Sequence, residues 1–149
     1  MARIEPDSVM GHPVPLADGE QIIAEFRPNR AVYWRSHLVM AVVLGALAGV
    51  VLLWQANPYP VMGPIGAVIA IAARAAFVQS EAMAEIWRLT DRHLLGPASR
   101  AIPLAQIQTA RPFLGAVQLI TRAGDKHLIK YQADPAATAA RLIAAGRQT

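Results

Sequence analysis

A stretch of 38 residues without Lys, Arg, Asp or Glu, residues 36–73, limits what this 149-residue chain can fold into. Two apolar segments, residues 37–54 and 61–78, cover this region, and residues 55–60 between them hold two prolines and an asparagine. A helix of 18 residues is about 27 Å long, close to the thickness of the hydrocarbon core of a bilayer. The pattern therefore predicts a transmembrane helical hairpin over residues 37–78 with a reversal between the two helices.

Two other interpretations of this region are open. The two segments can form a buried helical hairpin in a soluble core, although the rest of so short a chain is too small to cover it. The first segment can instead be a signal peptide, but the first 35 residues are acidic and proline-rich, with no short apolar run before a cleavage site. We expect residues 1–18 to be a flexible arm. Residues 19–36 are a juxtamembrane segment in which residues 20–27 form a strand or a short amphipathic helix that Pro28 ends.

The charges around the hairpin predict its orientation. The net charge is +4, and the basic excess lies in residues 79–149, which hold nine Lys and Arg against five Asp and Glu. Six arginines flank the apolar segments, three before the first and three at or after the end of the second: Arg27, Arg30, Arg35, Arg74, Arg88 and Arg92. Because the connecting loop is uncharged, both termini are expected to face the cytoplasm. No signature of a nucleic-acid-binding module accompanies the basic residues, so we expect no nucleic-acid partner.

Small residues recur within both apolar segments. Gly45 and Gly49 form a GxxxG motif, and Gly63 and Gly66 have similar spacing in the second segment. Such residues let helix backbones approach closely, so these faces are expected to pack on each other, or on a second copy or another membrane protein. Arg74 is the one charge inside a predicted span. It lies about one turn from the cytoplasmic end, where its side chain can reach the headgroups or pair with a partner subunit.

Residues 79–149 have the pattern of an α+β module. Alternating runs predict four or five antiparallel strands, with a turn at residues 96–99 and a hairpin loop at 123–125. The runs cover residues 86–90, 93–95, 101–110, 117–122 and 126–131. A C-terminal helix follows, with Asp134 as its N-cap, Pro135 at its first position and Gly146 at its end. Its predicted apolar face consists of Ala136, Ala139, Ala140 and Ile143.

Two short motifs in this module match a known family. The first contains Trp87, Thr90, Asp91 and Arg92, and the second contains Ile102, Pro103, Leu104 and Ile107. With the hairpin before them, they make the chain resemble the bacterial pleckstrin-homology-like membrane proteins of the YdbS/YdbT type, in a form with two transmembrane helices. The resemblance implies a small antiparallel β-barrel or sheet with a C-terminal helix, located on the cytoplasmic side of the bacterial inner membrane.

The motif residues have a structural and a functional interpretation. Thr90 and Asp91 are expected to tighten a turn by accepting hydrogen bonds from nearby backbone amides. Arg92, with Arg74 and Arg88, is a candidate contact for lipid or for a protein partner. Asp91 and His93 lie two residues apart and form a conceivable general-base pair, which is the only basis for an enzymatic hypothesis.

The remaining composition argues against several kinds of site. The chain has no cysteine, which excludes disulfides, thiolate catalysis and iron–sulfur clusters. Its four histidines are scattered without metal-ligand spacing, and no motif of a known catalytic site occurs, so we expect no catalytic residues, no metal and no cofactor. The four are His12, His37, His93 and His127.

The sequence therefore favours a non-enzymatic inner-membrane protein that presents a cytoplasmic module to a protein partner. It would act as an assembly factor or as an accessory subunit of a membrane complex. Its partners would be membrane lipids and other membrane protein subunits or a second copy of the chain. The alternative is that the basic module binds anionic lipid headgroups or senses membrane stress.

Overall fold

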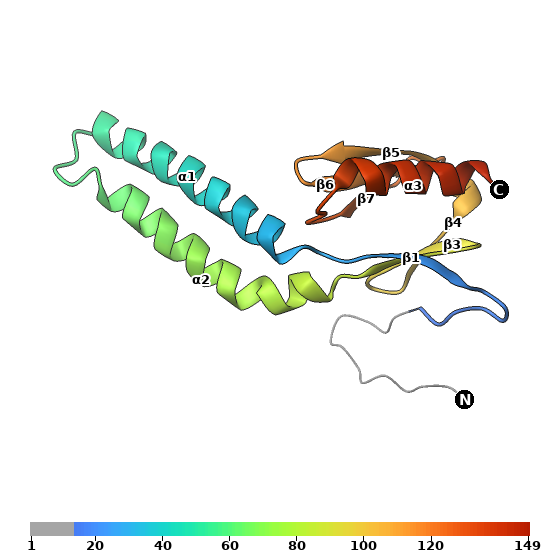
Figure 1. Ribbon diagram of the computed structural model, residues 1–149. Helices are drawn as coiled ribbons and strands as arrows, with labels where there is room; N and C mark the ends of the chain where they lie inside the picture. Colours follow the sequence, from blue (N-terminus) through green and yellow to red (C-terminus); the bar gives the residue numbers. More distant parts are fainter. Residues whose placement is uncertain (1–13) are drawn as a thin grey trace. The chain divides into compact units, whose positions relative to one another are not determined.

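The computed structural model describes residues 14–149, so most of the predicted flexible arm, and His12 with it, lies outside the described residues. The chain divides into two compact units (Figure 1). One consists of residues 30–83 and is called the helical unit below. The other, the β unit, is formed by the chain on both sides of it, up to residue 29 and from residue 84 onward.

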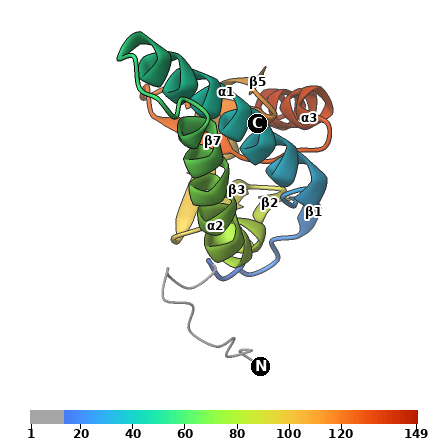
Figure 2. The same ribbon diagram turned by 90° about the vertical axis from the view of Figure 1, so that its left-hand side faces the viewer.

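The helical unit is a hairpin of two long helices, α1 (Arg30–Trp54) and α2 (Met62–Ala84), which lie side by side in both ribbon views (Figures 1 and 2). Each is long and apolar enough to cross a membrane, and little of either is buried within the chain. Core helices of a soluble protein would be mostly buried, so the structure does not favour that alternative. Both helices extend beyond the predicted spans, because the polar residues at their ends, such as Arg35 and Gln79, continue a helix readily.

One face of α1 carries its contact with α2. Tyr33, His37, Ala41 and Gly45 follow each other at intervals of four residues, and they are the buried residues of this helix. The Tyr33 hydroxyl donates a hydrogen bond of 2.6 Å to the carbonyl of Ala75 on α2. The buried stripe therefore combines small residues with one polar contact, as is typical of helix pairs in membranes.

The four glycines singled out in the sequence differ in their surroundings. A Cβ added at Gly63 would lie 2.9 Å from the carbonyl carbon of Ala48, which is closer than real Cβ atoms approach backbone. Added at Gly45 or Gly49, it would lie 3.4 or 3.3 Å from atoms of Pro64. At Gly66 it would meet no atom of the described residues within 4 Å, so the structure does not place Gly66 in the contact between the helices.

The β unit contains two antiparallel sheets and one helix (Figure 1). The first sheet has the order β1-β2-β3-β4 and the second the order β5-β6-β7, and neither sheet closes on itself. Helix α3 (Pro135–Arg147) packs against β5 and β6. The strand bounds are β1 Ile22–Phe26, β2 Trp87–Thr90, β3 His93–Gly96, β4 Arg100–Pro103, β5 Ile107–Phe113, β6 Ala116–Thr121 and β7 Lys126–Ile129.

The predicted strands are mostly confirmed, with one clear error. Of the two alternatives for residues 20–27, the strand is right. This strand, β1, pairs with β2, although the whole helical hairpin lies between them in the sequence. The single strand expected over residues 101–110 is wrong, because a 3₁₀ turn, η1 (Leu104–Gln106), splits it into β4 and β5 of different sheets. Pro103 lacks a backbone N–H for a continued ladder, and the next side chain, Leu104, turns into the core.

The C-terminal helix begins as predicted and differs at its face and its end. The Asp134 carboxylate accepts from the Ala137 backbone amide at 3.1 Å, so the N-cap is confirmed. The buried side is formed by Thr138, Ala139 and Leu142, whereas Ala136 and Ala140 are exposed. Gly146 does not end the helix, which continues to Arg147. A Cβ at Gly146 would lie 3.2 Å from the Ile107 side chain, so this glycine allows α3 to approach η1 and β5 closely.

Candidate functional site

The Thr90–His93 turn of the family motif joins β2 to β3 in the β unit. The Thr90 hydroxyl oxygen accepts hydrogen bonds from the backbone amides of His93, at 2.8 Å, and of Arg92, at 3.2 Å. The Asp91 carboxylate accepts from the backbone amide of Gln21 at 3.1 Å, and the Asp91 amide donates to the Gln21 carbonyl. The predicted role in tightening the turn through nearby amides is confirmed for Thr90, whereas Asp91 instead connects the turn to Gln21, seventy residues earlier in the chain.

A buried carboxylate, Glu20, lies directly beneath this turn. Its side chain is only 2% exposed. One carboxylate oxygen accepts from the Thr90 hydroxyl and lies 2.9 Å from Nδ1 of His93, and the other accepts from the Ala17 backbone amide at 2.9 Å. Three donors, two from the Thr90–His93 turn and one from the residues just before Glu20, therefore converge on one carboxylate, and we call this group the Glu20 cluster.

The hydrogen bonds of the Glu20 cluster keep the carboxylate ionised. The bond from Thr90 and then that from Ala17 lower the pKa of Glu20 from 4.5 to about 2, with a further contribution from His93, while burial acts in the opposite direction. A carboxylate only accepts hydrogen bonds, so Nδ1 of His93 carries the proton of the bond to Glu20. Both oxygens of the ionised carboxylate thus have hydrogen-bond donors at neutral pH. This arrangement favours a structural role, in which Glu20 holds the chain just before β1 to the β2–β3 turn.

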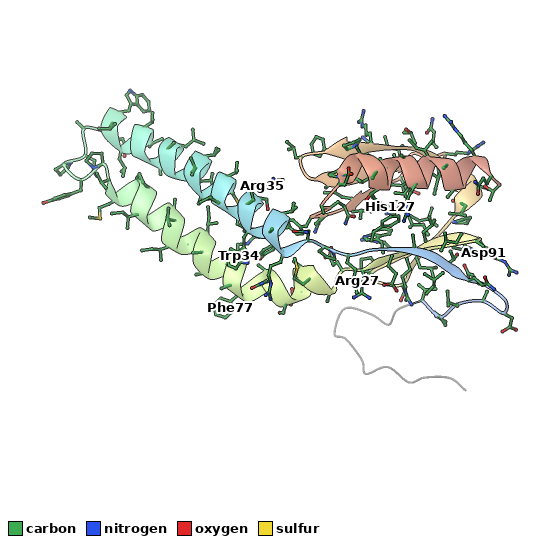
Figure 3. The ribbon with its side chains drawn as sticks, in the orientation of Figure 1. Arg27, Trp34, Arg35, Phe77, Asp91 and His127 are labelled. Carbon is green, nitrogen blue, oxygen red and sulfur yellow. The ribbon has the colours of Figure 1, made fainter. Side chains whose placement is uncertain are left out.

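The conceivable general-base pair of Asp91 and His93 has different partners in the structure. His93 pairs with Glu20, and Asp91 is exposed at the end of the first sheet, bound to Gln21 (Figure 3). A carboxylate–imidazole pair of this kind occurs in catalytic sites, where the imidazole faces a nucleophile or a substrate. Here the neighbouring hydroxyl, that of Thr90, is already engaged by Glu20 and by two backbone amides.

The three candidate contact arginines do not form one site. Arg88 lies on β2, half-buried, opposite Glu25 of β1. Arg92 is exposed in the β2–β3 turn, with its guanidinium 3.5 Å from the Asp18 carbonyl. Arg74 is exposed on α2, in the helical unit. Nothing in these contacts selects a lipid or a protein for any of them.

The apolar residues of the two motifs belong to the core of the β unit. Trp87 is buried against Gly96, where an added Cβ would lie 2.6 Å from its ring. The second motif contributes three buried side chains, from Ile102, Leu104 and Ile107. The motif residues therefore account for the packing of the β unit and for the hydrogen bonds of its β2–β3 turn.

Sequence reasoning missed two features of the β unit. Glu20 lies about seventy residues before its partners, and nothing in the local pattern distinguishes it from other surface glutamates. Exposed apolar side chains on β1, namely Ile22 and Ile23, were also not singled out, because exposure is a tertiary property. Among residues 14–149, no group of three or more His, Cys, Asp or Glu side chains is placed to hold a metal ion.

Comparisons with protein-family models, with curated proteins and with solved structures find no match to this chain. The resemblance to the bacterial pleckstrin-homology-like family therefore stays a prediction from the two motifs and the hairpin.

Proposed function

We propose that this chain is a non-enzymatic protein of the bacterial inner membrane, with both termini in the cytoplasm. Its helical unit anchors it, and its β unit is a pleckstrin-homology-like module that binds a protein partner. In this role it acts as an assembly factor or as an accessory subunit of a membrane complex. Each part of the proposal has its own support.

The exposed surface of the helical unit supports membrane anchoring. Large apolar side chains cover the outer faces of both helices, and Figure 3 shows Phe77 projecting away from α2. In water so large an apolar surface would drive aggregation, whereas lipid or neighbouring membrane helices cover it without cost. Arg30 and Arg35 lie in the first turns of α1, Arg88 follows α2 by a few residues, and the connecting loop is uncharged, which supports a cytoplasmic location of both termini.

The architecture of the β unit supports the pleckstrin-homology-like assignment in outline. Seven strands occur in the described residues, in sheets of four and three, and a C-terminal helix packs on the second sheet. An antiparallel β module followed by a C-terminal helix agrees with what the resemblance implies, although the two sheets pair separately. A fold alone does not define a ligand, so the partner has to be argued from the surface.

The observation that carries the protein-partner proposal is the exposed edge of β1. This strand is at the end of the first sheet, and no strand of the described residues pairs with its other side. Ile23 is 63% exposed at a bulge in the ladder, next to the exposed Ile22. Apolar side chains beside unpaired backbone donors and acceptors suit a polypeptide partner, because lipid cannot supply matching amide groups.

Site-specific crosslinking in native membranes tests this proposal. A photo-crosslinking amino acid at residue 23 is expected to give one discrete adduct with another protein, and the same probe at Ala98, an exposed turn residue, is expected to give none. Ile23→Asp should abolish co-purification of that protein in mild detergent, whereas Ala98→Asp should not. A chain that elutes alone under these conditions, with no adduct from residue 23, would refute the proposal.

A further inference from the structure

The turn between β5 and β6 exposes two large apolar side chains. Leu114 is 90% exposed and Phe113 is 52% exposed. Single apolar residues on a surface are common and need no explanation. The position of this pair in the chain, and the conformation of its backbone, set it apart.

The backbone at this turn is unfavourable for leucine. Leu114 and Gly115 lie between the paired residues Phe113 and Ala116, and both have positive φ, of +47° and +79°. Two-residue hairpin turns of this kind favour Asn, Asp or Gly at the first position. A residue with a Cβ is strained there, because its Cβ comes too close to the following carbonyl oxygen. Leu114 therefore has an unfavourable backbone conformation, and its side chain is almost completely exposed within the described part of the chain.

Hydrogen bonds within the β unit connect this turn to the chain segments that enter the helices. The Gly115 carbonyl accepts from the Gln132 amide at 2.9 Å, and the Tyr131 carbonyl accepts from the Asn29 amide at 2.6 Å. Asn29 directly precedes the first residue of α1. The β5–β6 turn is thus hydrogen-bonded to Gln132, and the neighbouring residue Tyr131 is hydrogen-bonded to the last residue before α1.

A second, weaker contact joins the same sheet end to the residue that follows α2. Nζ of Lys130 lies 3.8 Å from the carboxylate of Glu85, the residue after the end of α2. Within the β unit, both contacts place the β5–β6 turn at the end from which the chain leaves toward α1 and α2.

The charges around the turn suit such a surface. Arg111 precedes Phe113 on β5, Lys130 flanks the turn from the end of β7, and Arg27 lies in the connector to α1. Two acids accompany them, since Glu25 pairs with Arg27 at 2.7 Å and Glu85 faces Lys130. Arg111, which is hydrogen-bonded to the neutral side chain of Gln118, adds a cation next to the apolar tip, a combination typical of segments that lie in the headgroup region of anionic membranes.

We infer that the β5–β6 turn is a lipid contact, in which Leu114 and Phe113 insert into the interfacial region of the bilayer that holds α1 and α2. The inference rests on the proposed membrane anchoring. A protein partner for the turn is less favoured, since two side chains offer far less than the roughly 800 Å² per partner of a stable protein interface. Lipid contact needs no such area, because the anchor makes it intramolecular.

The absence of cysteine makes a direct test possible in the full chain. Leu114→Cys is labelled with an environment-sensitive fluorophore and placed in nanodiscs of phosphatidylcholine and phosphatidylglycerol that contain spin-labelled lipid. Ala98→Cys is the matched control, because Ala98 is also exposed in a turn at positive φ, of +56°. Val50→Cys, on the exposed surface of α1, reports the anchor itself.

The inference predicts that lipid quenching at residue 114 exceeds that at residue 98 by at least about twofold. Equal quenching at the two positions, with strong quenching at residue 50, would overturn the lipid contact and leave the anchor intact. Weak quenching at residue 50 would refute the anchor and the lipid contact together. A label at residue 114 that is shielded only in native membranes, and not in nanodiscs, would assign the turn to a protein and overturn the inference.

A second variant separates lipid contact from folding. Leu114→Asn places a favoured residue in the turn, so the β unit should be as stable as the parent or more stable. With the label moved to Phe113→Cys, adding Leu114→Asn should lower lipid quenching at residue 113. Unchanged quenching in this stably folded variant would argue against insertion of the turn.

Discussion

The ionised carboxylate of Glu20 is expected to stabilise the β unit in a pH-dependent way. Its pKa is about 2 in the folded chain against an ordinary value of 4.5. Each pKa unit corresponds to about 1.4 kcal/mol, so the difference represents on the order of 3 kcal/mol of stability. Folding lowers this pKa, so the contribution is complete above pH 4.5. It declines as the pH falls toward 2 and is absent below that value.

Glu20→Gln removes the titrating charge and keeps the shape of the side chain. One side of the amide is also a donor, so it cannot accept from Ala17 and from Thr90 as both oxygens of Glu20 do. We expect the free energy of unfolding at pH 7 to fall by about 2–3 kcal/mol. Between pH 5 and pH 2 the variant should lose less stability than the parent, since it lacks the titrating group.

Urea unfolding of the full chain in nanodiscs, followed by the fluorescence of Trp87, measures this difference. Trp87 is buried in the β unit, and replacing Trp34 and Trp54 with phenylalanine leaves it as the only tryptophan. Glu85→Gln is the matched control, because its half-exposed carboxylate makes only a 3.8 Å contact with Lys130 and should contribute little. Parallel pH profiles for the parent and for the Glu20 variant would refute the reasoning.

Two further predictions concern glycines at close contacts. Gly96→Ala should destabilise the β unit by about 1–3 kcal/mol in the same urea assay, because its methyl group would lie 2.6 Å from the buried ring of Trp87; a variant as stable as the parent would contradict this packing. Gly63→Ala should weaken the contact between α1 and α2, where the methyl group would lie 2.9 Å from the Ala48 backbone, and Gly66→Ala should not. Crosslinking yield between cysteines introduced on the two helices measures this, and equal yields in the two variants would contradict it.

The parts of the fold that the sequence predicts are those set by local patterns. Hydropathy identifies the two long helices, because an apolar run of this length has few other solutions. Alternation and turn residues find most strands, and Asp134 followed by Pro135 marks the start of α3. In each case the relevant residues lie within a few positions of one another.

The failures all depend on contacts that are distant in sequence. The predicted strand is interrupted at Leu104, whose side chain is buried in the core shared by the two sheets. Alternation along a single strand does not reveal this burial. The buried face of α3 is the one that packs against β5, whatever the polarity of its residues. Thr138 is therefore buried while Ala140 is exposed. Glu20 has no local signal, since its burial depends on Thr90 and His93 seventy residues away.

The family motifs and the proposed contacts divide the β unit into residues of two kinds. Thr90 and Asp91 are engaged by backbone groups of the β unit itself, so a chain that shares them would share this turn without sharing a ligand. Ile23, Phe113 and Leu114 have the opposite property, since little within the described residues accounts for their exposed apolar side chains. Binding specificity is therefore expected to change with the second group, which a motif comparison based on the first group cannot detect.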